Sequence, residues 1–418
     1  MQTFVWSELS ARERSDALAR PSCLSDNTVR DSVIRIMADV QNRGDAAVRD
    51  YTRHFDGVAP VDLSVSKSEW ETAWNNLDEA DRDAMKMAKA NIETFHVAQI
   101  PQTIEVETMP GVMCRRESRP IRSAGLYVPG GTAPLVSTLM MLAIPAKIAG
   151  VVRRIVVTPP DEDGNVDPAI LAAAHLCDVS AVFVCGGAQA IAALAYGTDT
   201  IQGCDKIFGP GGGPAIDLPA GPSEAMVIAD DTTNPVFAAS DLLSQAEHDT
   251  LAQIVCVCSS PRIADTIKAE VKIQIRILPR HKIVEKSMNY ARFFIAENRQ
   301  EIVQIINSYA PEHLIILTDQ GDDLVGDIHN AGSIFLGPWT PESVGDYASG
   351  ANHTLPTSGA VKAYSGLTLE SFMKYVSIQK LSQDGLRKLG PAVERLATME
   401  KLEAHKRAVT LRLETLDG

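Results

Sequence analysis

The sequence has no Cys-x-x-Cys pair, although it contains seven cysteines in 418 residues. This spacing excludes the common zinc–thiolate motifs, and the odd number of cysteines argues against a disulfide framework. Cys256 and Cys258 lie two residues apart in a strand-like run, so their thiols share one face of a strand, where we expect them to be buried. The pattern is typical of reduced thiols, and we predict a cytoplasmic protein.

Positive charge is scarce as well. The chain has 39 lysines and arginines against 53 aspartates and glutamates, a formal net charge of −14 at pH 7. Nucleic acids and anionic membrane surfaces both select clustered lysine and arginine, so we expect no nucleic acid and no membrane as partner. The first twenty residues lack the basic flank and apolar core of a secretory signal. The longest apolar-rich stretch, residues 135–152, contains Pro145 and Lys147 and falls short of a membrane span.

The middle of the chain alternates between strand and helix patterns. The β-rich runs include residues 154–158, 225–229 and 253–258, and the helical stretches between them include residues 168–176, 188–196 and 236–246. Such alternation predicts an α/β fold class, with two Rossmann-like parallel-sheet domains that carry helices on both faces. Ligands of such sheets bind at the carboxyl ends of the strands, so we expect the site at those ends.

Helical patterns extend the α/β region at both ends of the chain. We divide the chain into an N-terminal helical region that serves as a lid or dimerisation layer and partly joins the sheet domains (1–120), a Rossmann-like α/β domain (121–235), a second Rossmann-like α/β domain (236–365) and a C-terminal helical segment (366–418). Within the last part, residues 368–376 and 391–413 are predicted helices.

The sequence also lacks a Gly-x-Gly-x-x-Gly motif at the opening of a βα turn. Several predicted strands do end in turns that carry glycine or proline, at residues 129–131, 186–187 and 209–213. These turns are not the ordinary dinucleotide-binding fingerprint, so composition and spacing alone do not predict NAD.

Four of the nine histidines occur in unusual sequence surroundings: His248, His313, His353 and His405. Gln245 lies three residues before His248 at the end of a predicted helix, which places both side chains on one face. Imidazole is a common zinc ligand and a carboxamide oxygen a weaker one, although taken alone the pair is more simply explained as a polar helix end. The other five histidines, which we interpret as structural or surface residues, are His54, His96, His175, His281 and His329.

Glu312 and His313 are adjacent at the start of a strand-like run. Neighbours on a strand point to opposite faces, but at the first residues of a strand both side chains can reach one crevice. Such a pair can move protons near neutral pH, whereas the simpler interpretation is a polar turn before a strand. Asp346, in a turn rich in glycine and serine, and His405, in a charged helix, are ordinary surface residues when taken alone.

Taken together, these segments resemble the histidinol dehydrogenase family over almost the whole chain. The resemblance rests on many specific segments in the same order: RGDAAVRDYTRHFD, ANIETFH, GLYVPGG, GGAQAIAALAYGT, DKIFGPG, AIDLPAGPSE, SDLLSQAEH, APEHL, AGSIFLG, GDYASGANHTLPTSG and AHKRAVTLR.

The resemblance implies a zinc- and NAD-dependent enzyme of histidine biosynthesis that oxidises L-histidinol to L-histidine through the aldehyde, using two NAD. It implies one Zn²⁺ per subunit, held by Gln245, His248, Asp346 and His405. The implied catalytic residues are Glu312 and His313, with His313 accepting protons and Glu312 activating water.

The resemblance further implies substrate contacts from Ser223, His353 and Glu400, together with the metal ligands and His313. Tyr127 and Gln189 match cofactor-contacting residues. The family is homodimeric, which implies that the C-terminal segment reaches the partner subunit and contributes Glu400 and His405 across the interface.

The sequence departs from the family pattern after Gly211. There the family continues with a cofactor-contacting Asn and a further helix, whereas this chain passes directly through GPGGGPAIDLPAGPSE. Three explanations stay open: residues omitted from the chain as given, a deletion, or natural absence. The last two sustain an alternative function, a zinc-binding relative with impaired or lost NAD use. A third candidate function, weaker than these two enzyme-related ones, is that of a structural or interaction protein.

Overall fold

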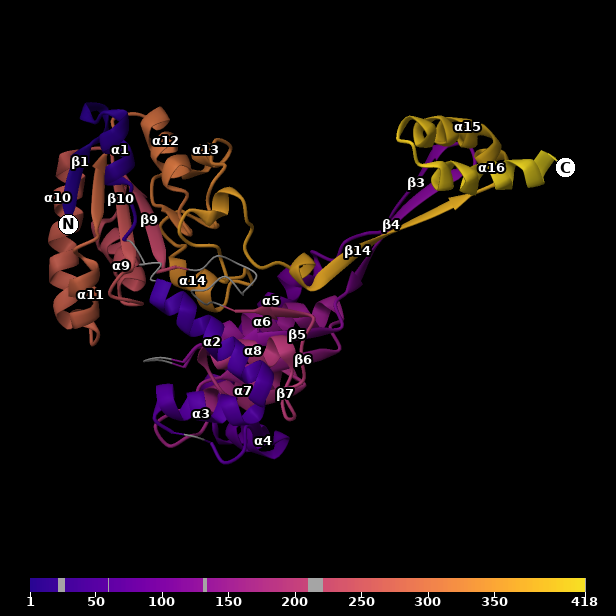
Figure 1. The fold of residues 1–418 in the computed structure, drawn as a ribbon. Coiled ribbons are helices and arrows are strands. Elements are labelled where there is room, and N and C mark those ends of the chain that lie inside the picture. The colour runs from indigo at the N-terminus through magenta and orange to yellow at the C-terminus, as the bar shows by residue number, and fades with distance from the viewer. Residues whose placement is uncertain (22–26, 59, 131–133, 210–220, 418) are drawn as a thin grey trace.

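The computed structural model describes residues 1–21, 27–58, 60–130, 134–209 and 221–417. Figure 1 shows two α/β bodies beside each other and a long arm that projects from one of them and carries the C-terminus. The segment after Gly211, where the sequence departs from the family pattern, lies outside the described residues. Within the described residues, no helix combines the length and apolar character needed to cross a membrane.

The first body is built on a five-stranded sheet. The strand order is β2 (Ser64–Val65), β7 (Ala181–Val184), β6 (Arg153–Thr158), β5 (Ser123–Tyr127) and β8 (Lys206–Phe208), and β2 alone of these five runs antiparallel to its neighbour. Its helices are α2 (Asn27–Arg43), α3 (Asp45–Asp56), α4 (Lys67–Asn76), α5 (Glu79–Val97), α6 (Val136–Ala149), α7 (Pro168–Cys177) and α8 (Gly187–Tyr196). The chain reverses its direction of strand addition between β5 and β8, as doubly wound folds do.

The second body has a six-stranded sheet in which every pair is parallel. The strand order is β1 (Gln2–Val5), β11 (Arg292–Ile295), β10 (Gln253–Cys258), β9 (Glu224–Ala229), β12 (His313–Ile316) and β13 (Ser333–Leu336). Its helices are α1 (Ala11–Ala17), α9 (Pro235–Ala246), α10 (Pro261–Gln274), α11 (His281–Ser287), α12 (Arg299–Tyr309), α13 (Gly321–Val325) and α14 (Glu342–Tyr347), with short 3-10 turns at Trp6–Glu8, Ile275–Ile277 and Ala360–Lys362.

Continuous apolar runs explain why these strands lie at the centre. All six residues of β9 and all six of β10 are buried, because helices cover both faces of a parallel sheet. One apolar cluster packs α9 and α10 on one face, and another packs Trp6, α1 and α12 on the other. Cys256 and Cys258 are buried with their sulfurs 3.5 Å apart, which confirms the expectation that they share a face.

The arm is a three-stranded antiparallel sheet capped by two helices. Its strands are β3 (Ile104–Met109), β4 (Val112–Pro120) and β14 (Met373–Leu381), followed by α15 (Gln383–Met399) and α16 (Glu403–Asp417). The helix predicted over residues 368–376 is wrong. A 3-10 turn at Leu369–Phe372 leads into β14, which pairs along its whole length with β4, more than 250 residues earlier in the chain. Local periodicity cannot reveal such long-range pairing.

The predicted α/β class with two parallel-sheet domains and helical segments at both ends is therefore confirmed. We retain the boundaries at residues 120 and 365 as a proposal, whereas the boundary at residue 235 lies too late, because β9 before it belongs to the second sheet. The structure adds that β1 and α1 lie on the second sheet, while β3 and β4 form part of the arm.

Candidate active site

A cavity of about 200 Å³ lies where the two bodies meet. One wall comes from the first body, through Pro129 after β5, Gly209 after β8, and α6. The opposite wall comes from the second body, through residues at the beginnings of β9 and β12 and the ends of α9 and α14. The cavity therefore needs both sheets.

The expected location at strand carboxyl ends holds for the first sheet and is wrong for the second. Ser223 immediately precedes β9, and Glu312 immediately precedes β12, so the second sheet contributes the amino ends of its strands. A helix that follows a parallel strand runs back antiparallel to it, so its C-terminal end arrives at the amino edge of the sheet. Gln245 near the end of α9 reaches the cavity in this way.

Seven of the predicted site residues line this one cavity: Ser223, Gln245, His248, Glu312, His313, Asp346 and His353. They come from positions up to 130 residues apart in the sequence, and the second body and its loops bring them together.

His313 occupies the centre of a group of carboxylates. Its Nε2 lies 3.5 Å from Asp346 Oδ1, and its Nδ1 lies 3.7 Å from Glu342 Oε1 and 3.8 Å from Glu312 Oε2. Nδ1 also lies 3.3 Å from the carbonyl oxygen of Glu224, to which it donates. Glu312 and His313 both line the cavity, so the strand's first residues do reach one crevice.

Burial and mutual charge set the protonation of this group. Burial raises the pKa of Glu312 to about 8, and burial likewise raises the pKa of Glu342 to about 8. Burial alone would lower the pKa of His313, but the charges of Glu342, Glu312 and Asp346 outweigh it and raise that pKa to about 10.

Glu342, which no sequence pattern singled out, is 1% exposed. With the Gln245 amide oriented to satisfy both of its neighbours, its nitrogen donates to Glu342 and its oxygen accepts from the Glu224 backbone N–H at 2.9 Å. Glu342 also belongs, with His313 and Asp346, to a group whose ligand atoms all lie within 4.8 Å of one another. Its position four residues before Asp346, on the same face of a helix, is the signal that could have revealed it.

The donor set of the cavity fits a metal cation. Gln245, His248 and Asp346 offer the oxygen and nitrogen ligands that zinc accepts, and all three line the same cavity. His353 Nε2 is buried and has no hydrogen-bond partner within the described part of the chain. Gln245 lies in the last turn of α9, where the helix dipole favours positive charge.

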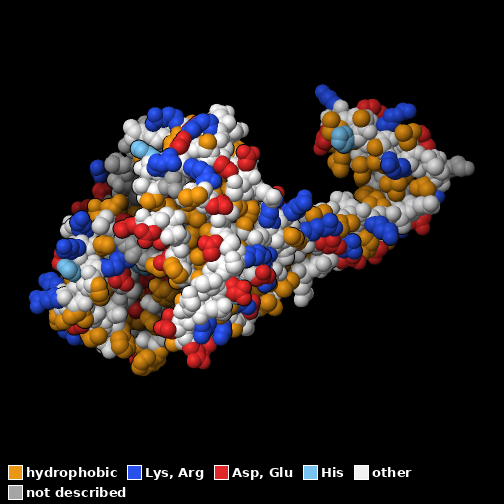
Figure 2. Space-filling view, turned by 90° about the horizontal axis from the view of Figure 1, so that it is seen from below, with side chains coloured by type: hydrophobic (Ala, Val, Ile, Leu, Met, Phe, Trp, Pro, Cys, Tyr) orange, Lys and Arg blue, Asp and Glu red, His pale blue; other side chains and the backbone are white. Residues whose placement is uncertain are grey.

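Glu400 and His405 do not line the cavity. Glu400 follows the last residue of α15 as its C-cap, His405 lies in the first turn of α16, and both are exposed. Figure 1 shows these helices at the far end of the arm, away from the two bodies. Exposed apolar side chains accompany them, including Leu396, Met399 and Leu402, and Figure 2 shows hydrophobic side chains gathered on this end of the molecule.

Tyr127 and Gln189 lie at the carboxyl edge of the first sheet. Tyr127 ends β5, and its hydroxyl accepts a hydrogen bond from the backbone N–H of Gly187, at 3.4 Å. Gln189 lies in the first turn of the helix that Gly187 begins, and its buried Oε1 has no hydrogen-bond partner among the described residues. The two predicted cofactor residues are thus linked through one turn.

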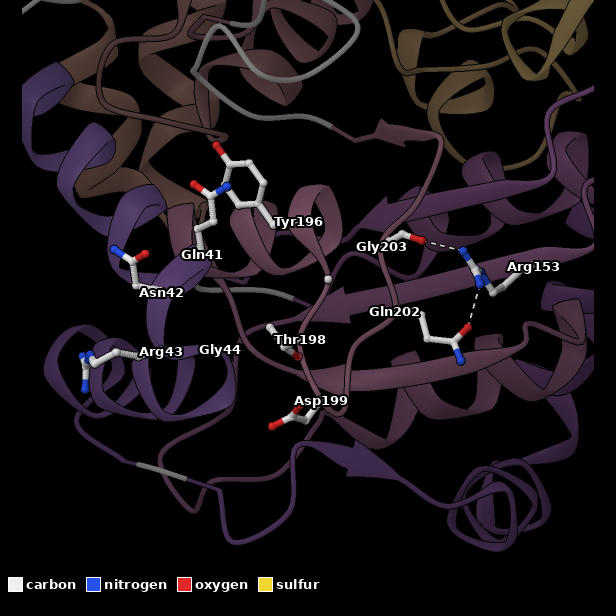
Figure 3. A pocket seen from close by; sticks show the side chains of 11 residues that line it. Gln41, Asn42, Arg43, Gly44, Arg153, Tyr196, Thr198, Asp199, Gln202 and Gly203 are labelled. Atoms are coloured by element: carbon white, nitrogen blue, oxygen red, sulfur yellow. Dashed lines mark hydrogen bonds between the residues drawn. The ribbon is translucent and has the colours of Figure 1, made fainter.

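A second, shallower pocket of about 590 Å³ lies between the end of α2 and the end of α8 (Figure 3). Arg153 donates there to Gln202 Oε1 at 2.6 Å and to the carbonyl oxygen of Gly203 at 2.5 Å. The pocket contains none of the predicted site residues.

Two doubly wound α/β bodies, with a cavity between them lined by ionisable side chains and by side chains of metal-ligating type, are an arrangement typical of a two-domain enzyme. The family model described as histidinol dehydrogenase matches residues 20–413. The histidinol dehydrogenase of Vibrio cholerae is 46% identical over 431 residues, covering 100% of this chain and 99% of that protein, and the one of Mannheimia succiniciproducens is 46% identical over 428 residues, covering 99% of each.

The crystal structure of histidinol dehydrogenase from Elizabethkingia anophelis is similar with a TM-score of 0.96 and 41% identity, covering 100% of this chain and 99% of that one. The chain belongs to the histidinol dehydrogenase family. Membership confirms the predicted enzyme class, an NAD-dependent oxidoreductase.

Proposed function

We propose that this protein oxidises L-histidinol to L-histidine through the aldehyde, with two NAD, as the last step of histidine biosynthesis. The observation that carries the proposal is the convergence of Gln245, His248 and Asp346 beside Glu312 and His313 in one cavity. Family membership supports the same reaction.

The residues of the cavity suit the two oxidations. In the first, His313 accepts the hydroxyl proton of the alcohol while hydride passes to NAD, giving the aldehyde. Glu312 then removes a proton from water as the water oxygen adds to the aldehyde carbon, and His313 returns its proton to the former carbonyl oxygen, which gives the hydrate. The hydrate loses a second hydride to a second NAD and a hydroxyl proton to His313, which gives the carboxylic acid. Ser223 and His353 hold the substrate in the cavity.

We propose one zinc ion per subunit, held by Gln245, His248, Asp346 and His405. When bound, zinc supplies a Lewis-acid clamp for the imidazole and amine nitrogens of histidinol. Gln245 would contribute its amide oxygen, and Glu342 accepts a hydrogen bond from the nitrogen of the same amide and so fixes the orientation of the amide. Tyr127 and Gln189 would contact NAD at the neighbouring edge of the first sheet.

We also propose a homodimer in which the arm of one subunit supplies Glu400 and His405 to the cavity of its partner. Three observations support it: the two residues are exposed, they lie on a projecting arm, and apolar side chains surround them. An exposed apolar patch on an arm is typical of an interface. The cytoplasmic location stays a prediction from the sequence.

The direct test mixes the purified, zinc-loaded protein with histidinol and NAD and follows the absorbance of reduced nicotinamide. We expect two NADH for each histidinol consumed, with histidine as the product. Absence of NADH from a protein that retains zinc would favour the alternative, a zinc-binding relative that has lost NAD use; no comparison favours this alternative. A protein that binds neither zinc nor histidinol would contradict both.

A further inference from the structure

Arg20 lies behind the cavity, in the segment that follows α1. Its Nε and Nη2 donate to the two carboxylate oxygens of Glu224 at 2.5 and 2.8 Å. The same Nη2 donates to the carbonyl oxygens of Tyr309 and Ala310 at 2.7 and 3.1 Å, and the guanidinium lies 4.0 Å from the centre of the Tyr309 ring. The Arg20 side chain is 20% exposed and that of Glu224 only 3%, so the ion pair is largely shielded from water.

Glu224 connects this ion pair to both proposed proton-transfer residues. Its backbone N–H, shared with the Gln245 amide oxygen, donates to Glu312 Oε2 at 3.0 Å, and its carbonyl oxygen accepts from His313 Nδ1 at 3.3 Å. Its side chain also accepts from the backbone N–H of Ser358 at 2.7 Å, next to Thr357 in the cavity wall. A shift of Glu224 would therefore move Glu312, His313 and a cavity-lining loop together.

The two carbonyls that Arg20 binds flank an unusual backbone conformation. Ala310 has a φ of +58°, in the left-handed region that residues with a Cβ avoid. It follows the last residue of α12, where helix carbonyls lack intrahelical partners, and it lies two residues before Glu312. Arg20 supplies a partner to the carbonyl on each side of this turn.

We propose that Arg20 is a positioning residue for Glu312 and His313, acting through the Glu224 side chain and the Tyr309–Ala310 turn. It does not line the cavity and needs no contact with substrate or cofactor. Within the reaction it sets the location of the proton-transfer groups, and in that respect the inference rests on the proposed function.

The requirement is for arginine rather than for a positive charge alone. A planar guanidinium reaches both oxygens of one carboxylate and the two carbonyls at once, whereas a lysine ammonium is a single point with no fixed fork. Arg20→Lys should therefore keep the buried charge balanced and the protein folded, while it loosens the geometry of the pair.

The experiment compares Arg20→Lys and Arg20→Met with Arg299→Met. Arg299 offers a matched control in the same body, since it also binds one carboxylate through Nε and Nη2, that of Asp327 at 3.1 and 2.7 Å, and a backbone carbonyl, that of Asp323. For folded variants we expect kcat with histidinol to fall about 10- to 100-fold in both Arg20 variants, with KM changed less than about threefold, and no such loss in Arg299→Met.

A second measurement separates this inference from the proposed function. In histidine-selective NMR spectra at fixed pH, the His313 ring signal, assigned by its loss in His313→Gln, should move in Arg20→Lys and stay in place in Arg299→Met. This holds even if the wild-type protein fails to oxidise histidinol, a result that would refute the proposed function alone. An unmoved His313 signal in folded Arg20→Lys overturns the inference, as does a kcat equal to that of the wild type.

Discussion

At the scale of single residues, the most consequential feature is the buried group of carboxylates around His313, where burial disfavours the charged form of a carboxylate. Glu312 and Glu342 both have raised pKa values because they are buried, and His313 has a raised pKa because those carboxylates and Asp346 surround it. Because this group binds more protons in the folded state than in the unfolded state, the stability of the metal-free protein depends on pH.

The pH dependence of unfolding has a definite sign. The pKa of Glu312 is about 8 in the folded protein against 4.5 ordinarily, so between these values the folded state keeps a proton that the unfolded state has lost. His313, with about 10 against 6.5, acts in the same direction at higher pH. The zinc-free protein should therefore lose stability as pH rises from 5 to 8.

Glu312→Gln should remove part of this loss. The free energy of unfolding is measured by urea denaturation after chelation of the metal. Between pH 5 and 8 we expect it to fall by about 1–3 kcal/mol more in the wild type than in the variant. Glu285→Gln, an exposed substitution on α11, serves as the control and should follow the wild type. Parallel pH curves for Glu312→Gln and the wild type would contradict the expectation.

The proposed ligands give a second prediction at this scale. His248→Ala or Asp346→Ala should lower zinc content by an order of magnitude or more after dialysis, measured by elemental analysis, because removing one ligand typically costs at least about tenfold in affinity. His281→Ala, an exposed histidine of α11, should retain the wild-type content. Full occupancy in either ligand variant would argue against the ligand set.

At the scale of elements, the ends of helices and strands locate the site. The end of α9 and the end of α14 bring Gln245 and Asp346 to the amino edge of the second sheet, where β12 begins with His313. The chain entering β13 approaches this edge closely at a glycine, Gly332. A Cβ on Gly332 would lie 2.6 Å from the carbonyl oxygen of Glu312, a backbone atom that cannot move aside cheaply.

Gly332→Ala should therefore disturb the strand beginnings that carry the catalytic pair. We expect a loss of about 1–3 kcal/mol in the free energy of unfolding, because overpacking forces the backbone to shift, and a lower kcat as well. Gly326→Ala is the matched control: no atom lies within 4 Å of its added Cβ, and its φ of −63° suits alanine. Unfolding of the two variants at the same urea concentration would contradict the expected loss of stability in Gly332→Ala.

At the scale of the whole molecule, the arm is the part whose role within a single chain is not evident from its contacts. Among the residues that the structure describes, its strands pair only with one another, and Glu400 and His405 lie with its helices, away from the cavity. A second copy of the chain resolves this, since each subunit would complete the site of the other.

Mixing two inactive variants tests the shared site. His405→Ala and Asp346→Ala homodimers should both be inactive. Random dimers assembled from equal amounts of the two, by coexpression, should regain about 25% of wild-type activity, because half of them carry one intact site. If each chain formed its own site, coexpression would restore no activity, and a monomer by light scattering would exclude the arrangement.

By itself the sequence determined the class of the fold and singled out the candidate site residues. Alternating strand and helix patterns can be recognised from residues that are close in the sequence. Gln245, His248, Glu312 and His313 lie in segments that resemble the family. The tertiary structure alone decided which edge of the second sheet forms the cavity, that residues 373–381 form a strand, and that Glu342 and Arg20 stand behind the proton-transfer pair. These features depend on contacts between residues that are far apart in the chain, and a local pattern carries no information about such distant partners.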